Sequence, residues 1–423
     1  MARDLHRTID TVWRMESARI IGAIARRVRD VGLAEELAQD ALVAALEHWP
    51  KDGIPDNPGA WLMTTAKNRA LDRLRQLNLH HAKQQELGAD ADARGDHVVP
   101  DFVDSLDDAD DIGDDLLRLV FTACHPVLSR EAQVALTLKL LAGMSTAEIA
   151  RAFLQPEPTI AQRIVRAKRT LGDANVPFEV PHGDALQDRL AAVLEVVYLI
   201  FNEGYSATAG DDWTRPALCD EALRLARILA QLSPGTAEVL GLVALMEIQA
   251  SRMRARLAAD GKPILLMAQD RGRWDQLLIG RGLAALARAR QLGGGGPGPY
   301  QLQAEIAACH ARARTPETTD WNRIVALYGD LMACTSSPVV ELNRAVAVSM
   351  ASGPAAALLL VDGLVTDGHL ARYHLLHAAR GDLLARLDRH DEARAEFERA
   401  AAMTANEREK ALLLERARDA RGH

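Results

Sequence analysis

Two short clusters in the second half of the sequence carry side chains that could do chemistry. One surrounds Glu203, and the other is the run Asp270-Arg-Gly-Arg-Trp-Asp275. A carboxylate beside tyrosines could act as a general acid or base, which would make the chain an enzyme. Such groups more often form a buried polar network or a peptide-binding groove, and we favour that interpretation. The residues singled out are Asn202, Glu203, Tyr205, Asp270, Arg273, Trp274 and Asp275.

The histidines and cysteines do not form a metal-binding pattern. The thirteen histidines are scattered, and neither His374 with His377 nor Cys309 with His310 is accompanied by the remaining ligands of a metal site. None of the four cysteines stands in a C-x-x-C pair. We therefore assign no metal, and we name no cofactor.

The charged side chains of the first half are segregated along the chain. Residues 60–83 carry five basic side chains against one acid, a net charge of +4, and residues 158–171 carry four basic side chains and no acid. Between them, residues 84–115 hold twelve acids and one arginine, a net charge of −11. The total of −8 excludes a uniformly basic nucleic-acid binder, but it hides two basic segments that could contact phosphates.

The second basic segment has the spacing of a helix-turn-helix. Ser145 and Glu148 form an S-x-x-E capping box, which predicts a helix that begins at Thr146 and stops before Pro156. A second helix would begin near Pro158, and its Gln and Arg side chains could reach base edges and phosphates. The alternative is an amphipathic helix with a solvated basic face. The predicted DNA contacts are Thr159, Gln162, Arg163, Arg166, Lys168 and Arg169.

The pattern of apolar residues predicts an all-α protein. Apolar side chains recur at spacings of three and four almost throughout, alanine, leucine and arginine dominate, and β-branched alternation is scarce. The interruptions divide the 423 residues into segments 1–80, 81–111, 112–175 and 183–423, of which 81–111 is the acidic linker.

Several strings in the sequence resemble one protein family. Residues 30–41 and 58–75 resemble region 2 of extracytoplasmic-function (ECF) sigma factors, and residues 136–171 resemble region 4. The strings that begin at Phe121, Tyr198 and Asp270 are similar to the subgroup with a long C-terminal extension of tetratricopeptide-like (TPR-like) helices. The resemblance implies a region 2 helical bundle, a region 4 helix-turn-helix and a C-terminal helical-repeat domain.

The resemblance also implies a function and assigns residues to it. It implies an alternative sigma factor that binds core RNA polymerase, recognises minus-10 and minus-35 promoter elements and initiates transcription. The acidic linker would lie in the polymerase channels, and a loop over residues 51–58 would hold an extruded base. The polymerase contacts would be Glu35, Glu36, Gln39 and Asp40. The DNA contacts of region 2 would be Asp56, Asn57, Lys67, Asn68, Arg69, Arg73 and Arg75.

The extension shows a repeating pattern of small and large residues, from which we expect helix pairs that approach closely. Its clearest unit is Gly381, Leu384, Ala393, Phe397 and Ala400, and weaker matches are Ala222, Leu229, Pro234, Ala326, Ala333 and Pro338. About 240 residues exceed what promoter binding needs. We therefore expect the extension to regulate the sigma module in cis or to bind a partner protein.

Two other function classes remain open at this point. One is a helix-turn-helix regulator with a TPR-like sensor domain, which would bind DNA without docking on polymerase, and the other is an enzyme that uses Glu203. Charged residues interrupt residues 1–20, so we expect no signal peptide. No segment has the roughly 18 to 20 apolar residues of a membrane helix, and we expect a cytoplasmic protein with no membrane partner.

Overall fold

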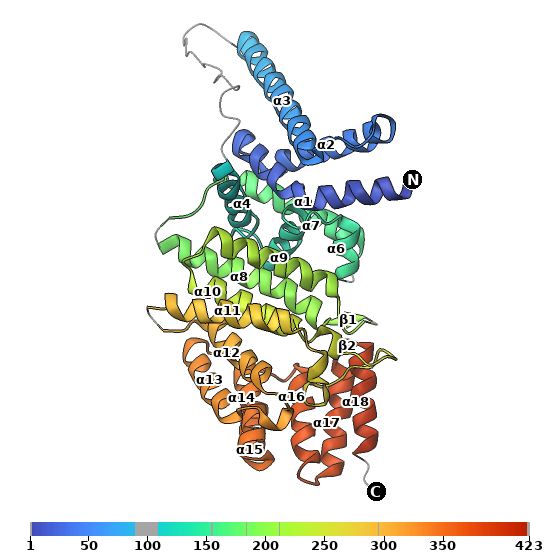
Figure 1. The fold of residues 1–423 in the computed structure, drawn as a ribbon, viewed down its shortest axis with the longest axis vertical. Helices are drawn as coiled ribbons and strands as arrows, with labels where there is room; N and C mark the ends of the chain where they lie inside the picture. Colours follow the sequence, from blue (N-terminus) through green and yellow to red (C-terminus); the bar gives the residue numbers. More distant parts are fainter. Residues whose placement is uncertain are drawn as a thin grey trace. The chain divides into compact units, whose positions relative to one another are not determined.

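The computed structural model describes residues 2–88, 109–153, 155–182, 184–210, 212–294 and 296–420. These residues form eighteen α-helices and one pair of two-residue strands, so the predicted all-α class is confirmed (Figure 1). The chain divides into two compact units, Met1–Val196 and Val197–His423. Among the described residues, no helix is both long and apolar enough to span a bilayer.

The first unit opens with a bundle of three long helices. These are α1 (Ala2–Val28), α2 (Val31–Asp52) and α3 (Pro58–Gly88), and each contacts the other two. Small residues let the helices approach, since Ala38 and Ala45 of α2 are fully buried. The Trp49 ring of α2 packs edge to face against the Trp61 ring of α3, with 5.5 Å between the ring centroids.

Helix α2 is longer than the sequence suggests. Pro50 lies inside its last turn, and the helix ends only at Gly53, whose φ of 88° favours glycine and whose N–H donates to the Trp49 carbonyl at 3.1 Å. Pro50 has no N–H to donate to the carbonyl four residues before it, so α2 loses one hydrogen bond there and ends two residues later. The loop predicted over residues 51–58 is therefore only 53–57, and Lys51 belongs to the helix.

The rest of the first unit contains the helix-turn-helix. Helices α4 (Ala109–Ala123) and α5 (Arg130–Leu140) precede α6 (Thr146–Ala152) and α7 (Glu157–Asp173). The capping box is present as predicted: Glu148 N–H donates to Ser145 Oγ at 3.2 Å, and Ser145 N–H donates to Glu148 Oε2 at 2.8 Å. Helix α7 begins after Pro156 without a side-chain cap, and Ile160, Ile164 and Leu171 bury its apolar face.

The second unit consists of helices that pack mainly on their neighbours in the chain, as in a solenoid. Helix α8 (Asp184–Tyr205) begins in the first unit and ends in the second. The remaining helices are α9 (Pro216–Leu232), α10 (Ala237–Ala250), α11 (Gln276–Leu292), α12 (Pro299–Arg312), α13 (Trp321–Cys334), α14 (Pro338–Ala351), α15 (Pro354–Asp367), α16 (His374–Ala385), α17 (His390–Met403) and α18 (Glu407–Asp419).

A parallel strand pair ties the beginning of the second unit to its end. Strand β1 (Ala209–Gly210) pairs with β2 (Ala405–Asn406). The Asn406 side chain reinforces the pair by donating to the Ala207 carbonyl at 3.1 Å and to the Asp212 carbonyl at 2.8 Å.

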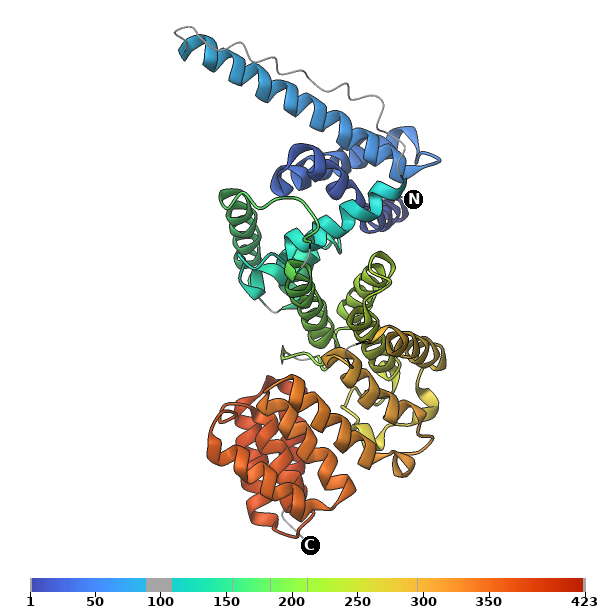
Figure 2. The same ribbon diagram turned by 90° about the vertical axis from the view of Figure 1, so that its left-hand side faces the viewer.

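The clearest predicted repeat is a close helix pair. Figures 1 and 2 both show α16, α17 and α18 side by side. A Cβ placed on Gly381 of α16 would lie 2.8 Å from the Phe397 ring of α17, so the backbone approaches an aromatic face. The weaker match in α13 and α14 is wrong: Ala326 and Ala333 are exposed, and Pro338 begins α14, because Ile324 and its neighbours supply the buried face of α13.

The contact between Gly381 and Phe397 yields a first prediction. Gly381→Val should lower the free energy of unfolding by about 2 kcal/mol or more, because the three added carbons have no space beside the ring. Gly363→Ala is the matched control. Gly363 lies in helix α15 with nothing within 4 Å of its added Cβ, and the change should stabilise by about 0.5 to 1 kcal/mol. Urea denaturation followed by circular dichroism measures both, and equal effects would contradict the packing.

Candidate nucleic-acid interface

One face of α7 presents four of the predicted DNA contacts together. Thr159, Gln162, Arg163 and Arg166 follow the spacing of three and four that puts side chains on one side of a helix. With residues 127–132, this face lines a shallow hollow of about 350 Å³. Among the described residues, no carboxylate forms an ion pair with Arg163 or Arg166. Both guanidinium groups can therefore bind phosphates or base edges without first breaking such a pair.

The other two predicted contacts of α7 are already engaged. Arg169 pairs with Asp173 at 3.4 Å on the exposed surface. Lys168 turns away from the shared face and its ammonium contacts the Glu35 carboxylate of α2. The sequence did not separate Lys168 from the exposed arginines, because its charge says nothing about which neighbour the side chain meets.

The exposed face of α3 carries most of the second basic cluster. Asn68, Arg69, Arg73 and Arg75 are exposed, whereas Lys67 is half-buried. The Arg69 guanidinium lies 3.6 Å from the Asp40 carboxylate of α2. Arg75 pairs with Asp72 at 3.5 Å within the helix. Both ion pairs are solvent-exposed, so DNA phosphates could replace them at little cost.

The loop before α3 presents Asp56 and Asn57 at the surface. The Asn57 side-chain oxygen accepts the Ala60 N–H at 3.1 Å, so it caps the first turn of α3. This bond leaves the side-chain amide group of Asn57 to contact a base. Most of the predicted acidic linker, residues 81–111, lies outside the described residues.

The predicted polymerase contacts of α2 are not all accessible. Glu36 is exposed, but Glu35 is only 3% exposed. The Glu35 carboxylate contacts Lys168 of α7, lies 3.6 Å from Lys139 of α5 and accepts a hydrogen bond from the Gln39 side chain. Gln39 and Asp40 are half-buried. Two lysines from the helix-turn-helix region thus cover the centre of the predicted polymerase surface.

Further contacts hold the first three helices against the helix-turn-helix region, and no sequence signal pointed to them. Arg14 of α1 pairs with Glu148, the acid of the capping box. Burial disfavours ionisation of Glu148, but the hydrogen bonds from Ser145 and the charge of Arg14 outweigh it and lower the pKa of that carboxyl. The buried Asp115 of α4 accepts from Arg118 at 2.8 Å and lies 3.4 Å from Arg26 of α1.

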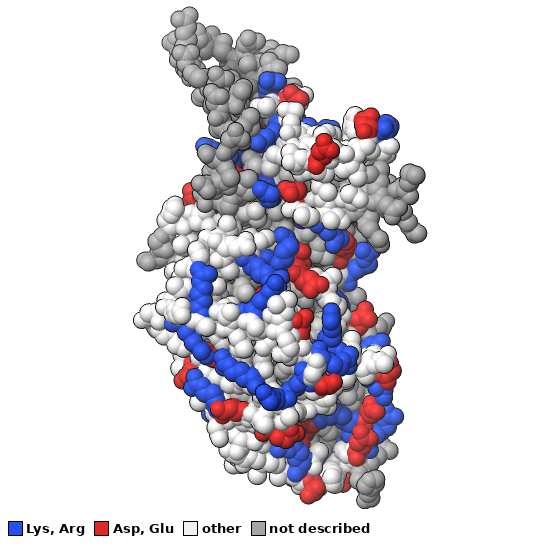
Figure 3. Space-filling view, in the orientation of Figure 1, with Lys and Arg blue, Asp and Glu red and all other residues white. Residues whose placement is uncertain are grey.

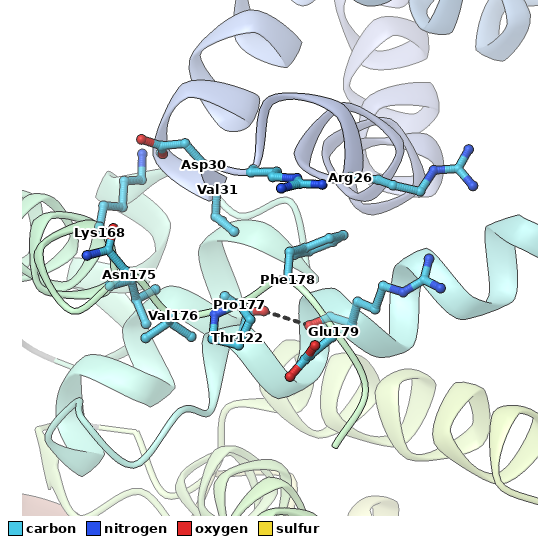
Figure 4. A pocket seen from close by; sticks show the side chains of 15 residues that line it. Arg26, Asp30, Val31, Thr122, Lys168, Asn175, Val176, Pro177, Phe178 and Glu179 are labelled. Carbon is cyan, nitrogen blue, oxygen red and sulfur yellow. Dashed lines mark hydrogen bonds between the residues drawn. The ribbon is translucent and has the colours of Figure 1, made fainter. Parts of the chain in front are cut away.

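A cavity of about 890 Å³ lies beside these contacts. Figure 4 shows Lys168 and Asp30 at one end and Arg26 and Glu179 at the other, with Phe178 between them. Its lining comes from α1, α2, α4, α7 and residues 174–179. The cavity therefore exists only while the helix-turn-helix region stays packed against α1 and α2.

The predicted cluster around Glu203 is a buried polar network within the extension. Its carboxylate pairs with Arg215 and accepts the Thr208 hydroxyl at 2.9 Å. Asp270 and Asp275 cap helical turns, since Asp270 accepts the Gly272 N–H at 2.9 Å and Asp275 accepts two amides at the start of α11. Asn202 and Tyr205 are half-buried, Arg273 is exposed and Trp274 is buried.

Family models match three parts of the chain. Sigma-70 region 2 matches residues 13–79, and sigma-70 region 4 matches residues 118–171. A family of unknown function matches residues 189–290 of the extension. No solved structure matches the chain.

Similar proteins cover either nearly all of the chain or about two fifths of it. An uncharacterised protein of Rhizobium meliloti is 44% identical over 410 residues, 96% of this chain and 95% of the relative. The ECF RNA polymerase sigma factor SigK of Mycobacterium ulcerans is 30% identical, over 36% of this chain and 78% of SigK. The probable ECF sigma factor SigI of Mycobacterium tuberculosis is 26% identical, over 41% of this chain and 58% of SigI.

The buried position of Glu35 yields a second prediction. Glu35→Gln should lower the free energy of unfolding by about 3 kcal/mol, because Lys168 and Lys139 would lose the charge that offsets their own partial burial. Glu36→Gln removes the same charge from the exposed neighbour and should change stability by less than about 0.5 kcal/mol. Urea denaturation distinguishes the two, and a Glu35→Gln variant as stable as Glu36→Gln would refute the role of the ion pair.

Proposed function

Because the chain belongs to the ECF group of RNA polymerase sigma factors, with a long helical extension after region 4, we propose that it recognises a minus-10 and a minus-35 promoter element through two separate basic surfaces. The surface on α3, with Arg69 and Arg73, would hold the minus-10 strand. The face of α7 with the half-buried Arg163 and the exposed Arg166 would enter the major groove at the minus-35 element. Core RNA polymerase and promoter DNA are the partners.

The observation that carries the proposal is the place of α2 between these surfaces. Its acidic side chains form ion pairs with both basic helices: Asp40 pairs with Arg69 of α3, and Glu35 pairs with Lys168 of α7. An acidic helix face also suits a basic docking surface on polymerase. The same carboxylates thus neutralise the sigma factor's own cations in the free protein and would bind polymerase in the complex.

This arrangement has to open before both promoter elements can be bound. The elements lie about 25 base pairs apart, or roughly 85 Å at about 3.4 Å per base pair. Five residues separate Glu35 from Asp40, about 7.5 Å along α2, so the basic groups that these two acids contact lie within roughly 30 Å of each other. We infer that polymerase binding replaces the contacts of Glu35 and lets region 4 move away from region 2.

Promoter opening needs no catalytic residue in this protein. A base that leaves the stack transiently can be captured by Asp56 and Asn57, while Asn68, Arg69 and neighbouring cations hold the adjacent phosphates. Polymerase supplies the chemistry of RNA synthesis. We place the protein in the cytoplasm, where polymerase and the chromosome are found, and we propose that the extension regulates the sigma module or binds a partner protein.

The alternative of a regulator that acts without polymerase is less well supported. Such a protein would need the helix-turn-helix but would have no use for region 2, which the family model matches over residues 13–79. The enzyme alternative is also weakened, because Glu203 is held by Arg215 and by a threonine hydroxyl.

Transcription with purified components gives a third prediction. The wild-type protein added to core polymerase should produce transcripts from a set of promoters in fragmented DNA of its own genome, detected by RNA sequencing. Arg163→Ala with Arg166→Ala should reduce those transcripts at least tenfold and leave core binding unchanged, because both arginines would contact only DNA.

The control removes the same charge from exposed arginines of the extension, Arg254→Ala with Arg281→Ala, and should transcribe at the wild-type level. If the wild-type protein binds core polymerase tightly and yet programmes no promoter, the sigma-factor proposal fails and the regulator alternative takes its place.

Opening of the sigma module gives a fourth prediction. Lys168→Met should raise the affinity for core polymerase about three- to tenfold in the absence of DNA, because Glu35 would no longer be held by that lysine and less of the binding energy would be spent on opening. Arg166→Met lies on the exposed face of the same helix and should leave the affinity unchanged. Fluorescence anisotropy with labelled protein measures both. A Lys168→Met variant with wild-type affinity would contradict the proposed competition.

A further inference from the structure

Three arginines converge on two aromatic rings in the second unit. The Arg256 guanidinium lies 3.6 Å from the centroid of the Tyr205 ring, and Arg252 lies 5.7 Å from the same centroid. Arg252 and Arg271 lie 5.8 and 5.2 Å from the centroid of the Trp274 ring. Tyr205 and Trp274 belong to the two motifs that the promoter-binding function leaves unexplained.

Two of these arginines are compensated by the carboxyl ends of helices. Arg256 donates to the Tyr205 carbonyl at the end of α8. Arg271 donates to the His310 carbonyl at 2.9 Å and the Ala313 carbonyl at 2.7 Å at the end of α12, and to the Thr319 hydroxyl at 3.0 Å. Helix carboxyl ends carry partial negative charge, so these contacts account for two buried cations.

The Arg252 guanidinium makes no such hydrogen bond to a helix carboxyl end among the described residues. It is half-buried between the two rings, and in the described residues no carboxylate forms an ion pair with it and no group accepts a hydrogen bond from its buried Nε. Its charge also acts on its neighbours. The pKa of Arg256 is lowered mainly by burial and further by the charge of Arg252. The pKa of Arg271 is lowered mainly by burial and further by the charge of Arg252, although the charge of Glu317 raises it. The local potential is therefore positive.

Further buried polar atoms beside Arg252 have no partner among the described residues. Trp274 Nε1, Arg271 Nε and His310 Nδ1 are all buried without a hydrogen bond, in residues that are at most 9% exposed. Burial, followed by the charges of Arg252 and Arg271, lowers the pKa of His310 to about 3, so the imidazole is neutral near pH 7. Several unpaired groups in one place are costly unless something binds them.

The acids of the same motifs are used elsewhere. The side chains of Asp270 and Asp275 cap helical turns, and Glu203 is paired with Arg215. Glu317 influences Arg271 only from a fully exposed position. In the described part of the second unit, no carboxylate lies within ion-pair distance of Arg252.

From this geometry we propose that the extension binds a small oxyanion, a phosphate or carboxylate group, at Arg252 with Trp274 Nε1 and Arg271 Nε as further donors. Planar guanidinium groups match such groups with two parallel hydrogen bonds. Arg252 has the Tyr205 and Trp274 rings beside it in place of a carboxylate, which leaves its N–H groups for a ligand. The bound oxyanion would supply the missing negative charge. This site is independent of the DNA and polymerase surfaces.

The test uses the full-length protein and inorganic phosphate as the probe, at constant ionic strength set with chloride. Tryptophan emission should change saturably, because Trp274 lies in the site, and the melting temperature should rise with phosphate. A parallel titration with succinate distinguishes a phosphate from a carboxylate ligand. A saturable response to either anion supports the site and assigns its class.

Variants locate the response. Arg252→Gln should weaken the apparent affinity at least tenfold, whereas Arg254→Gln, which removes an exposed charge two residues away, should stay within twofold of wild type. Arg252→Lys keeps the charge but loses the paired donors of the guanidinium group, so its apparent affinity for the anion should lie between those of Arg252→Gln and Arg254→Gln. If circular dichroism shows that Arg252→Gln is unfolded, Arg252→Lys takes its place in the test. The proposal is overturned by no saturable response to either anion, or by a response that both Arg252 variants retain in full.

Discussion

The most deeply placed ion pairs between the two halves of the first unit are made by one buried carboxylate of α2. Glu35 is withdrawn from water and lies between Lys168 and Lys139, which come from two helices of the opposite region. An ionised group cannot remain buried without partners, so region 2 and region 4 can separate only if water or another cation replaces both lysines. The contacts of Glu35 therefore bear on whether region 2 and region 4 can move apart to reach two separate promoter elements.

The two units treat their charges in opposite ways. In the first, the acids of α2 neutralise cations on α3 and α7, which keeps basic helices compact without nucleic acid. In the second, the acids near Arg252 are engaged as helix caps or with another arginine, so a cation stays unbalanced between aromatic rings. The paired charges of the first unit suit exchange with large charged partners, and the unpaired Arg252 of the second unit suits a small anion.

Much of the architecture could be predicted from local sequence signals. The capping box of Ser145 and Glu148 begins its own helix, and the small residue Gly381 lets its helix approach the next one. The structure contains both features as expected. The Glu35–Lys168 contact could not be predicted in this way, because periodicity identifies which face is buried but not which helix covers it. The predicted helix boundary at Pro50 is wrong for a related reason. Trp49 is buried by tertiary packing, and α2 continues past the proline.

The short strand pair between residues 209–210 and 405–406 has a mechanical consequence for the extension. An open solenoid frays from its ends, since its terminal helices are held by one neighbour each. Here the strand pair and the Asn406 side chain link the first and last parts of the extension to each other. Neither part can detach without breaking the hydrogen bonds of the strand pair and of Asn406. A displacement of Tyr205 at the end of α8 would therefore act on the start of α18 through only a few residues.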